Sequence, residues 1–194
     1  MLKLCFATSN QNKLKEVRAG LASGFELISL DDLNFYEEIP ETSGTIEGNS
    51  LQKAQFIWDR FQVNCFADDS GLEVDALDGA PGVDSAFYSG SRDFDANIAF
   101  LLNNLKDENN RQAQFKAVFT LVLEGNVQQF TGIIRGQILE QKRGEQGFGY
   151  DPVFVPDGYS HTFAEMTLDE KNKISHRAQA LRQLIDFLNN YPKI

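Results

Sequence analysis

The strongest constraint on the fold is a pair of long strand-like segments joined by a tight turn in the second half of the chain. Residues 113–123 carry apolar side chains at alternate positions and become apolar on both faces toward the end of the run. This pattern predicts a strand that is covered on both sides at its far end. The residues Glu124, Gly125 and Asn126 form a turn signal, and a second strand-like run continues to Ile134. The sequence therefore predicts an antiparallel hairpin.

The first half of the chain alternates short strands with amphipathic helices. The strands are expected at 4–7, 25–29 and 65–67, with a long acidic loop at 31–48. The helices are expected after the cap-type residues Thr8 to Asn10 as far as Gly24, over 49–61, near 95–105 and from Ile174 to Leu188. Because strands alternate with helices early and pair as hairpins later, we expect an α/β fold with a mixed sheet and flanking helices.

Composition limits the class of protein. A chain of 194 residues that is 42% hydrophobic suits one globular domain, divided into two lobes, with enough apolar side chains for a core. The polar stretch 103–112 is the expected boundary between the lobes. The formal net charge of −10 repels a nucleic-acid backbone, so we expect no nucleic-acid partner.

Cysteine usage and hydropathy point to the cytoplasm. Cys5 and Cys65 each stand in a short apolar stretch, which predicts buried reduced thiols and no disulfide framework. No apolar run approaches the ~20 residues that span a bilayer, and the first seven residues are too few for a signal-peptide core. We therefore expect no membrane contact and a cytoplasmic location.

Two polar motifs follow the predicted strands of the first half. One is a helix start whose unpaired backbone N–H groups can bind phosphate; it comprises Thr8, Ser9, Asn10, Gln11, Asn12 and Lys13. The other is the pair Asp68 and Asp69, expected at the end of a strand that stops at Ala67. Carboxylates in that place can bind Mg²⁺ or take a proton from water. An ordinary helix cap and an acidic turn are the simpler interpretations.

Two further motifs stand in the second half. Residues 147–152 place Phe148 and Tyr150 beside glycines, so the backbone can approach a flat ligand while a ring stacks on it. Lys171 and the residues 175–177 at the mouth of the last helix offer donors to an anion or a base edge. A glycine-rich turn and a surface helix cap would explain each motif alone. Together, the four motifs suggest a polyphosphate, a metal ion and a base.

In this order the motifs resemble those of the inosine triphosphate pyrophosphatase family, the pyrophosphatases for non-standard purine nucleoside triphosphates such as dITP and XTP. The resemblance covers essentially the whole chain. Its motifs are Thr8 to Lys13; Glu41 and Thr42 with Thr45, Asn49, Lys53 and Ala54; Ala67 to Leu72; Gly79 to Gly82; Phe148 to Pro152; Phe163 to Met166; and Lys171 with Ile174 to Arg177.

The resemblance implies hydrolysis of ITP, dITP and XTP to the monophosphate and pyrophosphate, with Mg²⁺ as cofactor, by a homodimer. It also implies that residues 1–194 form one pyrophosphatase domain, with an elongated mixed sheet and two lobes around a central cleft. Asp69 would be the general base and, with Glu41, a magnesium ligand, with Asp68 as an outer contributor. An ordinary aspartate has a pKa of about 4, which makes it a weak base at neutral pH. We therefore expect Asp68 and Glu41 to raise the pKa of Asp69.

The resemblance also assigns the substrate contacts. The residues implied to hold the phosphates are Thr8, Ser9, Asn10, Gln11, Asn12, Lys13, Lys53 and Lys171. Those implied to surround the nucleoside are Ser70, Phe148, Gly149, Tyr150, Asp151, His176 and Arg177, with Phe148 or Tyr150 stacked on the base.

Three residues depart from the family pattern. Ser9 stands where glycine is common, Gly48 where glutamate is frequent, and Phe87 where arginine is frequent. Two other functions stay open: a nucleotide-binding module without turnover, and a related pyrophosphatase that acts on modified pyrimidine or methylated nucleotides.

Overall fold

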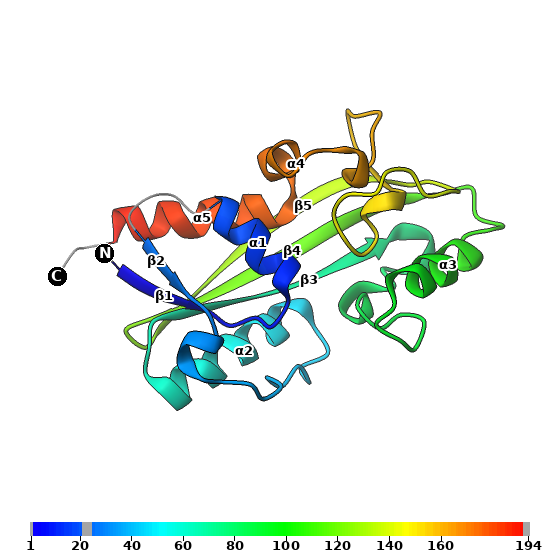
Figure 1. The fold of residues 1–194 in the computed structure, drawn as a ribbon. Helices are drawn as coiled ribbons and strands as arrows, with labels where there is room; N and C mark the ends of the chain where they lie inside the picture. Colours follow the sequence, from blue (N-terminus) through cyan, green and yellow to red (C-terminus); the bar gives the residue numbers. More distant parts are fainter. Residues whose placement is uncertain (1, 21–24, 192–194) are drawn as a thin grey trace. The chain divides into compact units, whose positions relative to one another are not determined.

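The structure is a computed structural model that describes residues 2–20 and 25–191. Its strands form one six-stranded sheet in the order β2-β1-β3-β4-β5-β6 (Figure 1). They are β1 (Leu2–Phe6), β2 (Phe25–Ile28), β3 (Cys65–Val74), β4 (Gln112–Leu123), β5 (Asn126–Ile138) and β6 (Phe154–Pro156). The α-helices are α1 (Gln11–Gly20), α2 (Ile46–Phe61), α3 (Phe94–Asn104), α4 (Leu168–Ile174) and α5 (His176–Asn190).

The sheet is mixed. Strand β1 pairs in parallel with both β2 and β3, whereas β5 pairs antiparallel with β6. The turn at Glu124 and Gly125 joins β4 directly to β5, its neighbour in the sheet, so these two strands form the expected hairpin. The α/β class with a mixed sheet is confirmed.

The chain divides into two compact units. Unit 1 contains the residues up to Asp69, residues 117–132 and the residues from Arg177 onward. Unit 2 contains residues 70–116 and 133–176. The strands β3, β4 and β5 each pass from one unit into the other along the chain.

The expected boundary at 103–112 is wrong, because this polar stretch lies inside unit 2. The apolar residues within and around it belong to the same core: Leu101 precedes the stretch, Leu105 lies within it, and Ala113 and Phe115 follow it. The polar stretch therefore forms a surface connection within unit 2 and does not divide its core.

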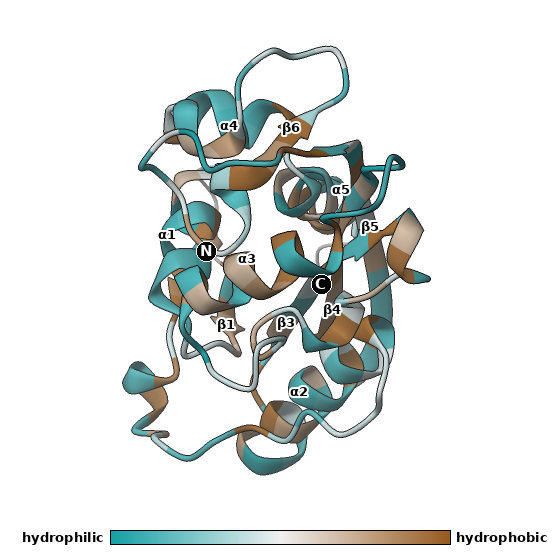
Figure 2. Ribbon diagram, turned by 90° about the vertical axis from the view of Figure 1, so that its right-hand side faces the viewer, coloured by the Kyte–Doolittle hydropathy of each residue, from teal (hydrophilic) through white to brown (hydrophobic). Residues whose placement is uncertain are grey.

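Unit 1 buries apolar side chains on both faces of its strands. Leu4 and Phe6 point to one face, where α1 and α5 pack, and Cys5 and Ala7 point to the other, where α2 packs (Figure 1). This alternation explains why the segment is apolar at every position, since successive side chains of a strand point to opposite faces. Figure 2 shows that α2 contains both hydrophobic and hydrophilic residues.

Both cysteines are buried and free, as predicted. Burial raises the pKa of each thiol to about 12, so neither forms a thiolate at neutral pH. No helix in the described part of the chain is long and apolar enough to cross a membrane.

Strand β3 is longer than predicted. The expected end at Ala67 is wrong, because the strand continues through Asp68 and Asp69 to Val74. Gly71 marks the reason: a Cβ there would lie 2.1 Å from the carbonyl oxygen of Gly82, so another backbone segment passes directly against the strand. Gly71 therefore permits a close approach of two backbone segments.

Three helix bounds also differ from prediction. Helix α2 begins at Ile46, inside the expected loop, because the Thr45 side chain accepts the N–H of Gly48 and caps the helix. Ile174 ends α4 and does not begin the last helix, since Ser175 is extended with φ −62° and ψ 153°. The expected helix end at Gly24 lies outside the described residues.

Three stacked rings at the centre of unit 1 yield a stability prediction. Phe6, Phe66 and Phe119 are fully buried, with ring centroids 4.7–6.1 Å apart. We expect Phe66→Ala to lower the free energy of unfolding by about 3–5 kcal/mol, because it leaves a cavity among these rings. Urea unfolding measures the loss. Phe87→Ala, at a residue that is 56% exposed, is the control and should change the value by less than about 0.5 kcal/mol.

Candidate active site

The start of α1 is capped by the polar turn that precedes it. The Asn10 side-chain oxygen accepts the backbone N–H groups of Asn12 and Lys13 at 3.0 and 3.2 Å, and Thr8 accepts the N–H of Asn10 at 3.2 Å. The predicted cap is confirmed. Ser9, Gln11 and Asn12 are exposed at this turn. The Lys13 ammonium lies 3.1 Å from an Asp68 carboxylate oxygen, so the chain itself supplies an anion for this first-turn lysine.

Asp68 is the centre of a buried charge cluster in unit 1. Its Oδ2 atom accepts the Nε–H of Arg177 at 3.1 Å and pairs with Lys13 at the same distance. Arg177 also binds Glu16 of α1 through its Nη1 atom. Burial alone would raise the pKa of Asp68, but Lys13 and Arg177 outweigh it and lower the pKa to about 2. Asp68 is therefore ionised at neutral pH.

Asp69 lies beside a second lysine. Its Oδ1 atom is 3.6 Å from the Lys53 ammonium of α2, and Lys53 also pairs closely with Glu41. Burial raises the pKa of Asp69 against the opposing effect of Lys53 and Lys13, and the charges of Glu41 and Asp68 raise it further. The upward direction agrees with the sequence expectation, although burial is a larger cause than the neighbouring carboxylates.

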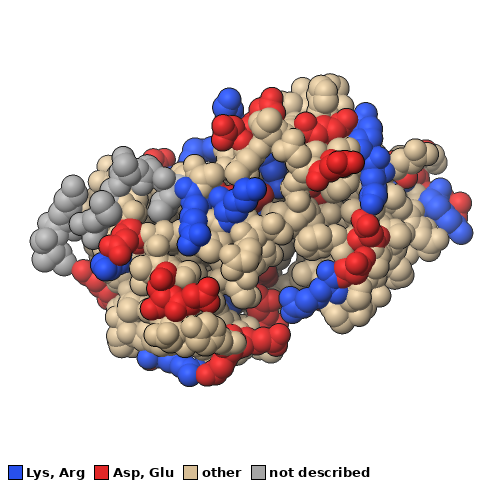
Figure 3. Space-filling model, in the orientation of Figure 1, with Lys and Arg blue, Asp and Glu red and all other residues tan. Residues whose placement is uncertain are grey.

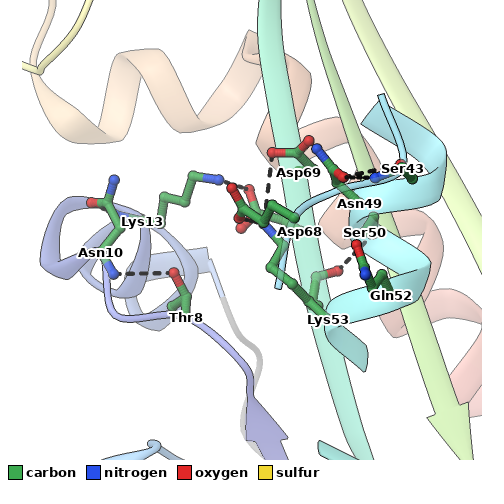
Figure 4. Close-up of polar contacts among 12 residues, drawn as sticks. Thr8, Asn10, Lys13, Ser43, Asn49, Ser50, Gln52, Lys53, Asp68 and Asp69 are labelled. Carbon is green, nitrogen blue, oxygen red and sulfur yellow. Dashed lines mark hydrogen bonds and ion pairs between the residues drawn. The ribbon is translucent and has the colours of Figure 1, made fainter. Parts of the chain in front are cut away.

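The strand geometry separates the two adjacent carboxylates. Consecutive residues in β3 point to opposite faces of the sheet, which places Asp68 toward α1 and Asp69 toward α2. Figure 4 shows the Lys13 side chain directed at Asp68, with Lys53 and Asn49 on the α2 side. The two pKa values move in opposite directions. Neighbouring carboxylates whose environments differ in this way are typical of a division between a charged anchor and a general base.

Two carboxylate oxygens in this cluster suit a cation. Asp68 Oδ1 and Asp69 Oδ2 are buried and have no hydrogen-bond partner among the described residues. In the same part of the chain, no group of three or more His, Cys, Asp or Glu is placed to hold a metal by itself. Mg²⁺ commonly binds one or two protein carboxylates and completes its shell with water and phosphate oxygens. Asp69 and the half-exposed Glu41 fit that kind of site.

Unit 2 contains a separate buried ion pair. The Lys171 ammonium lies 2.6 Å from Asp151 Oδ2, which also accepts the backbone N–H of Phe148 at 2.9 Å. The same ammonium lies 5.0 Å from the ring centroid of Phe148 and 5.4 Å from that of Phe163. Gly147 permits this arrangement, since a Cβ there would lie 2.0 Å from Asp151 Oδ2.

The remaining predicted residues of unit 2 differ in exposure. Tyr150 is in the core and donates its hydroxyl to the Ser85 carbonyl at 2.9 Å, whereas Phe148 and Gly149 are half-buried. His176 is buried, with its ring stacked on Phe115 at a centroid distance of 4.8 Å. Ser70 is half-buried in β3.

The structure thus collects the predicted residues in two groups. Those of unit 1 are Thr8 to Lys13, Glu41, Lys53, Asp68, Asp69 and Arg177, and those of unit 2 are Ser70, Phe148 to Asp151, Lys171 and His176. Arg177 was expected near the nucleoside, and its guanidinium binds Asp68 and Glu16.

The sequence is similar to those of known proteins over nearly its whole length. The sequence pattern of the Ham1 family matches residues 4–187. The chain belongs to the Ham1 family. A protein of Flavobacterium johnsoniae named dITP/XTP pyrophosphatase is 50% identical over 188 residues, which cover 96% of this chain and 98% of that protein. A Bacillus subtilis protein with the same name is 42% identical over 193 residues, with 97% and 98% covered.

The Ham1 fold is shared as well. The structure of the Staphylococcus aureus Ham1 protein matches with a TM-score of 0.89 at 34% identity, covering 98% of this chain and all of that one. The family resemblance that the motifs indicate is therefore confirmed.

Sequence reasoning missed one member of this Ham1 chain's charge cluster. Glu16 is only 6% exposed although it carries a charge, and it binds Arg177. A signal was present, because Glu16 follows Lys13 by three residues and shares the buried side of α1 with Leu14 and Val17. An acidic residue on the buried side of a helix is almost never without a charged or hydrogen-bonding partner.

The buried pair in unit 2 yields a second stability prediction. We expect Lys171→Met to lower the free energy of unfolding by about 3–5 kcal/mol, because the buried Asp151 carboxylate loses this cation. Lys142→Met is the matched control. It breaks the exposed pair of Lys142 and Asp95, at 2.8 Å, and should cost less than about 1 kcal/mol. Equal losses in urea unfolding of the two variants would contradict the prediction.

Proposed function

We propose that this protein is a Mg²⁺-dependent pyrophosphatase that hydrolyses ITP, dITP and XTP to the nucleoside monophosphate and pyrophosphate. The observation that carries the proposal is Asp69, a buried carboxylate with a raised pKa beside Lys53. Its support is the nearly full-length match to proteins named dITP/XTP pyrophosphatase. In this role, the enzyme would remove non-standard purine nucleotides from the nucleotide pool.

In the proposed chemistry, Asp69 acts as the general base. A water molecule attacks the α-phosphorus while Asp69 accepts its proton, and the bond from that phosphorus to the bridging oxygen breaks, so pyrophosphate leaves. Negative charge develops on the departing oxygens, and the ammonium groups of Lys13 and Lys53 would stabilise it. A phosphate contact by Lys171 stays a prediction. A carboxylate with a raised pKa is a better proton acceptor than an ordinary aspartate at neutral pH.

Asp69 and Glu41 would hold the Mg²⁺ ion, which when bound supplies positive charge to the phosphate oxygens. Asp68 would contribute from outside this pair. Its own role is to anchor Lys13 and Arg177, because its pKa of about 2 keeps it ionised beside both cations. The capped turn at Thr8 to Lys13 would hold phosphate with its exposed polar side chains, because the backbone N–H groups of Asn10, Asn12 and Lys13 are bonded within the turn.

We assign the nucleoside to the residues of unit 2. The half-buried ring of Phe148 is the better candidate for stacking on a base, because Tyr150 is packed into the core. Donors among Ser70, Gly149 and His176 would favour the 6-oxo group of hypoxanthine or xanthine over the 6-amino group of adenine, which leaves such donors unpaired. A base contact by Arg177 stays a prediction.

The partners and location belong to the same proposal. We propose a homodimer in the cytoplasm with a small-molecule nucleotide as substrate. Free buried thiols suit a reducing compartment. Figure 3 shows acidic side chains among the basic ones over the visible face, and the formal net charge of −10 disfavours a nucleic-acid partner. Light scattering of the purified protein measures the oligomeric state.

The first test measures pyrophosphate release from ITP, dITP, XTP, ATP and GTP, with Mg²⁺ and with a chelator. We expect rapid Mg²⁺-dependent release from the first three and little from ATP or GTP. Binding without release from any of them would favour a nucleotide-binding module. Preference for modified pyrimidine or methylated nucleotides would favour the related pyrophosphatase.

The second test replaces Asp69 with Asn, which keeps the shape of the side chain and removes the base. We expect kcat to fall about 10²- to 10⁴-fold, while equilibrium binding of a Mg²⁺–nucleotide persists. Asp59→Asn, at an exposed residue of α2, is the control and should leave kcat unchanged. Near-normal turnover by Asp69→Asn would exclude Asp69 as the base.

A further inference from the structure

Three consecutive residues of the segment before α2 are bound to side chains of that helix. Glu41 pairs with Lys53, Thr42 with Gln52, and Ser43 with Asn49. The residues 41–43 therefore lie against the helix as a short strap, which we call the 41–43 strap. Its first residue is the carboxylate that accompanies Asp69.

The middle contact of the strap is reciprocal. The Thr42 backbone N–H donates to Gln52 Oε1 at 2.8 Å, and Gln52 Nε2 donates to Thr42 Oγ1 at 2.9 Å. One side chain thus satisfies both a backbone and a side-chain group of the residue that follows Glu41. Gln52 also directly precedes Lys53, so the two ends of the Glu41–Lys53 pair are each one residue away from this contact.

The helix surface is shaped to receive the strap. Ser43 donates its N–H to Asn49 Oδ1 at 3.0 Å, and Asn49 is only 4% exposed. A Cβ at Gly48 would lie 2.3 Å from Ser43 Oγ, so the strap occupies the space that a side chain would need. Gly48, a departure from the family pattern, is therefore matched to this close packing.

The helix that carries the strap is fixed to the strand that carries Asp69. Ser50 is fully buried and donates to the Ala67 carbonyl at 3.2 Å, and its hydroxyl lies 2.8 Å from Thr120 Oγ1 on β4. Ala67 is two residues before Asp69 in β3. A strap held on α2 is therefore held at a set distance from Asp69.

We propose that Gln52 is a positioning residue that holds the 41–43 strap on α2 and so presents the Glu41 carboxylate beside Lys53 and Asp69. That Gln52 holds the strap is inferred from the hydrogen bonds alone. That this affects catalysis rests on the proposed function. Gln52 itself touches no reacting atom. Its contribution is to reduce the conformational freedom that Glu41, with a side chain that is 47% exposed, would otherwise have.

The test compares Gln52→Ala with Gln55→Ala in the full-length protein. Gln55 is a matched control because it is a half-buried glutamine on the same helix whose amide binds Asp59 at 2.8 Å, away from the strap. Gln52→Glu is the conservative variant, since a carboxylate can accept both the Thr42 N–H and the Thr42 hydroxyl. Gly48→Ala is a second variant that disturbs the strap through packing.

The first measurement is amide hydrogen exchange at residues 42 and 43 without any ligand. We expect Gln52→Ala to accelerate exchange at these residues roughly tenfold, with Gln52→Glu close to wild type and Gln55→Ala unchanged there. Gly48→Ala should act in the same direction as Gln52→Ala. Unchanged exchange in Gln52→Ala would overturn the positioning role, whatever the protein's activity.

The second measurement is pyrophosphate release from ITP as a function of Mg²⁺ concentration. We expect Gln52→Ala to raise the Mg²⁺ concentration for half-maximal rate roughly tenfold, with the KM for ITP at saturating Mg²⁺ changed less than about twofold and with rescue by Gln52→Glu. Faster exchange with an unchanged Mg²⁺ requirement would overturn the catalytic part. No release by the wild-type protein would instead refute the proposed function, and the exchange data would still decide whether Gln52 holds the strap.

Discussion

The charge cluster around Asp68 is the interaction on which the rest of unit 1 depends. A buried carboxylate is costly unless cations and donors surround it, and here Lys13 comes from α1 and Arg177 from α5. Glu16 then balances Arg177 from α1. Two helices and a strand are thereby bound through one set of charges beside the aromatic core of Phe6, Phe66 and Phe119.

The position and chemistry of Asp69 follow from that anchor. Because β3 is extended at both aspartates, fixing Asp68 on one face directs Asp69 to the other, where Lys53 lies. Lys13 and Arg177 pair directly with Asp68 and outweigh its burial, whereas burial prevails at Asp69 and raises its pKa. Two identical side chains, adjacent in sequence, therefore acquire different roles from their surroundings alone.

Local patterns predicted the elements better than their ends. The apolar runs of β1 and β4 and the presence of a helix at α2 are confirmed, since each depends on residues that are near in sequence. The end of β3 was predicted too early, because the polar pair Asp68 and Asp69 after Ala67 is typical of an acidic turn. Gly71 is required by the Gly82 carbonyl that packs against it, a contact that residue spacing does not show. The supposed boundary at 103–112 failed for the same reason.

The sequence by itself determined the α/β class, the capped start of α1, the buried thiols and the family, because caps, periodicities and ordered motifs are local or linear properties. It also identified Asp69 and its lysines as candidates. Only the tertiary structure decided that Arg177 binds Asp68 and Glu16, which are 109 and 161 residues away in the chain. It likewise decided which aspartate pairs directly with two cations and which has a raised pKa. Those outcomes depend on burial and on distances of a few ångströms between charges, and both arise only when distant segments pack together.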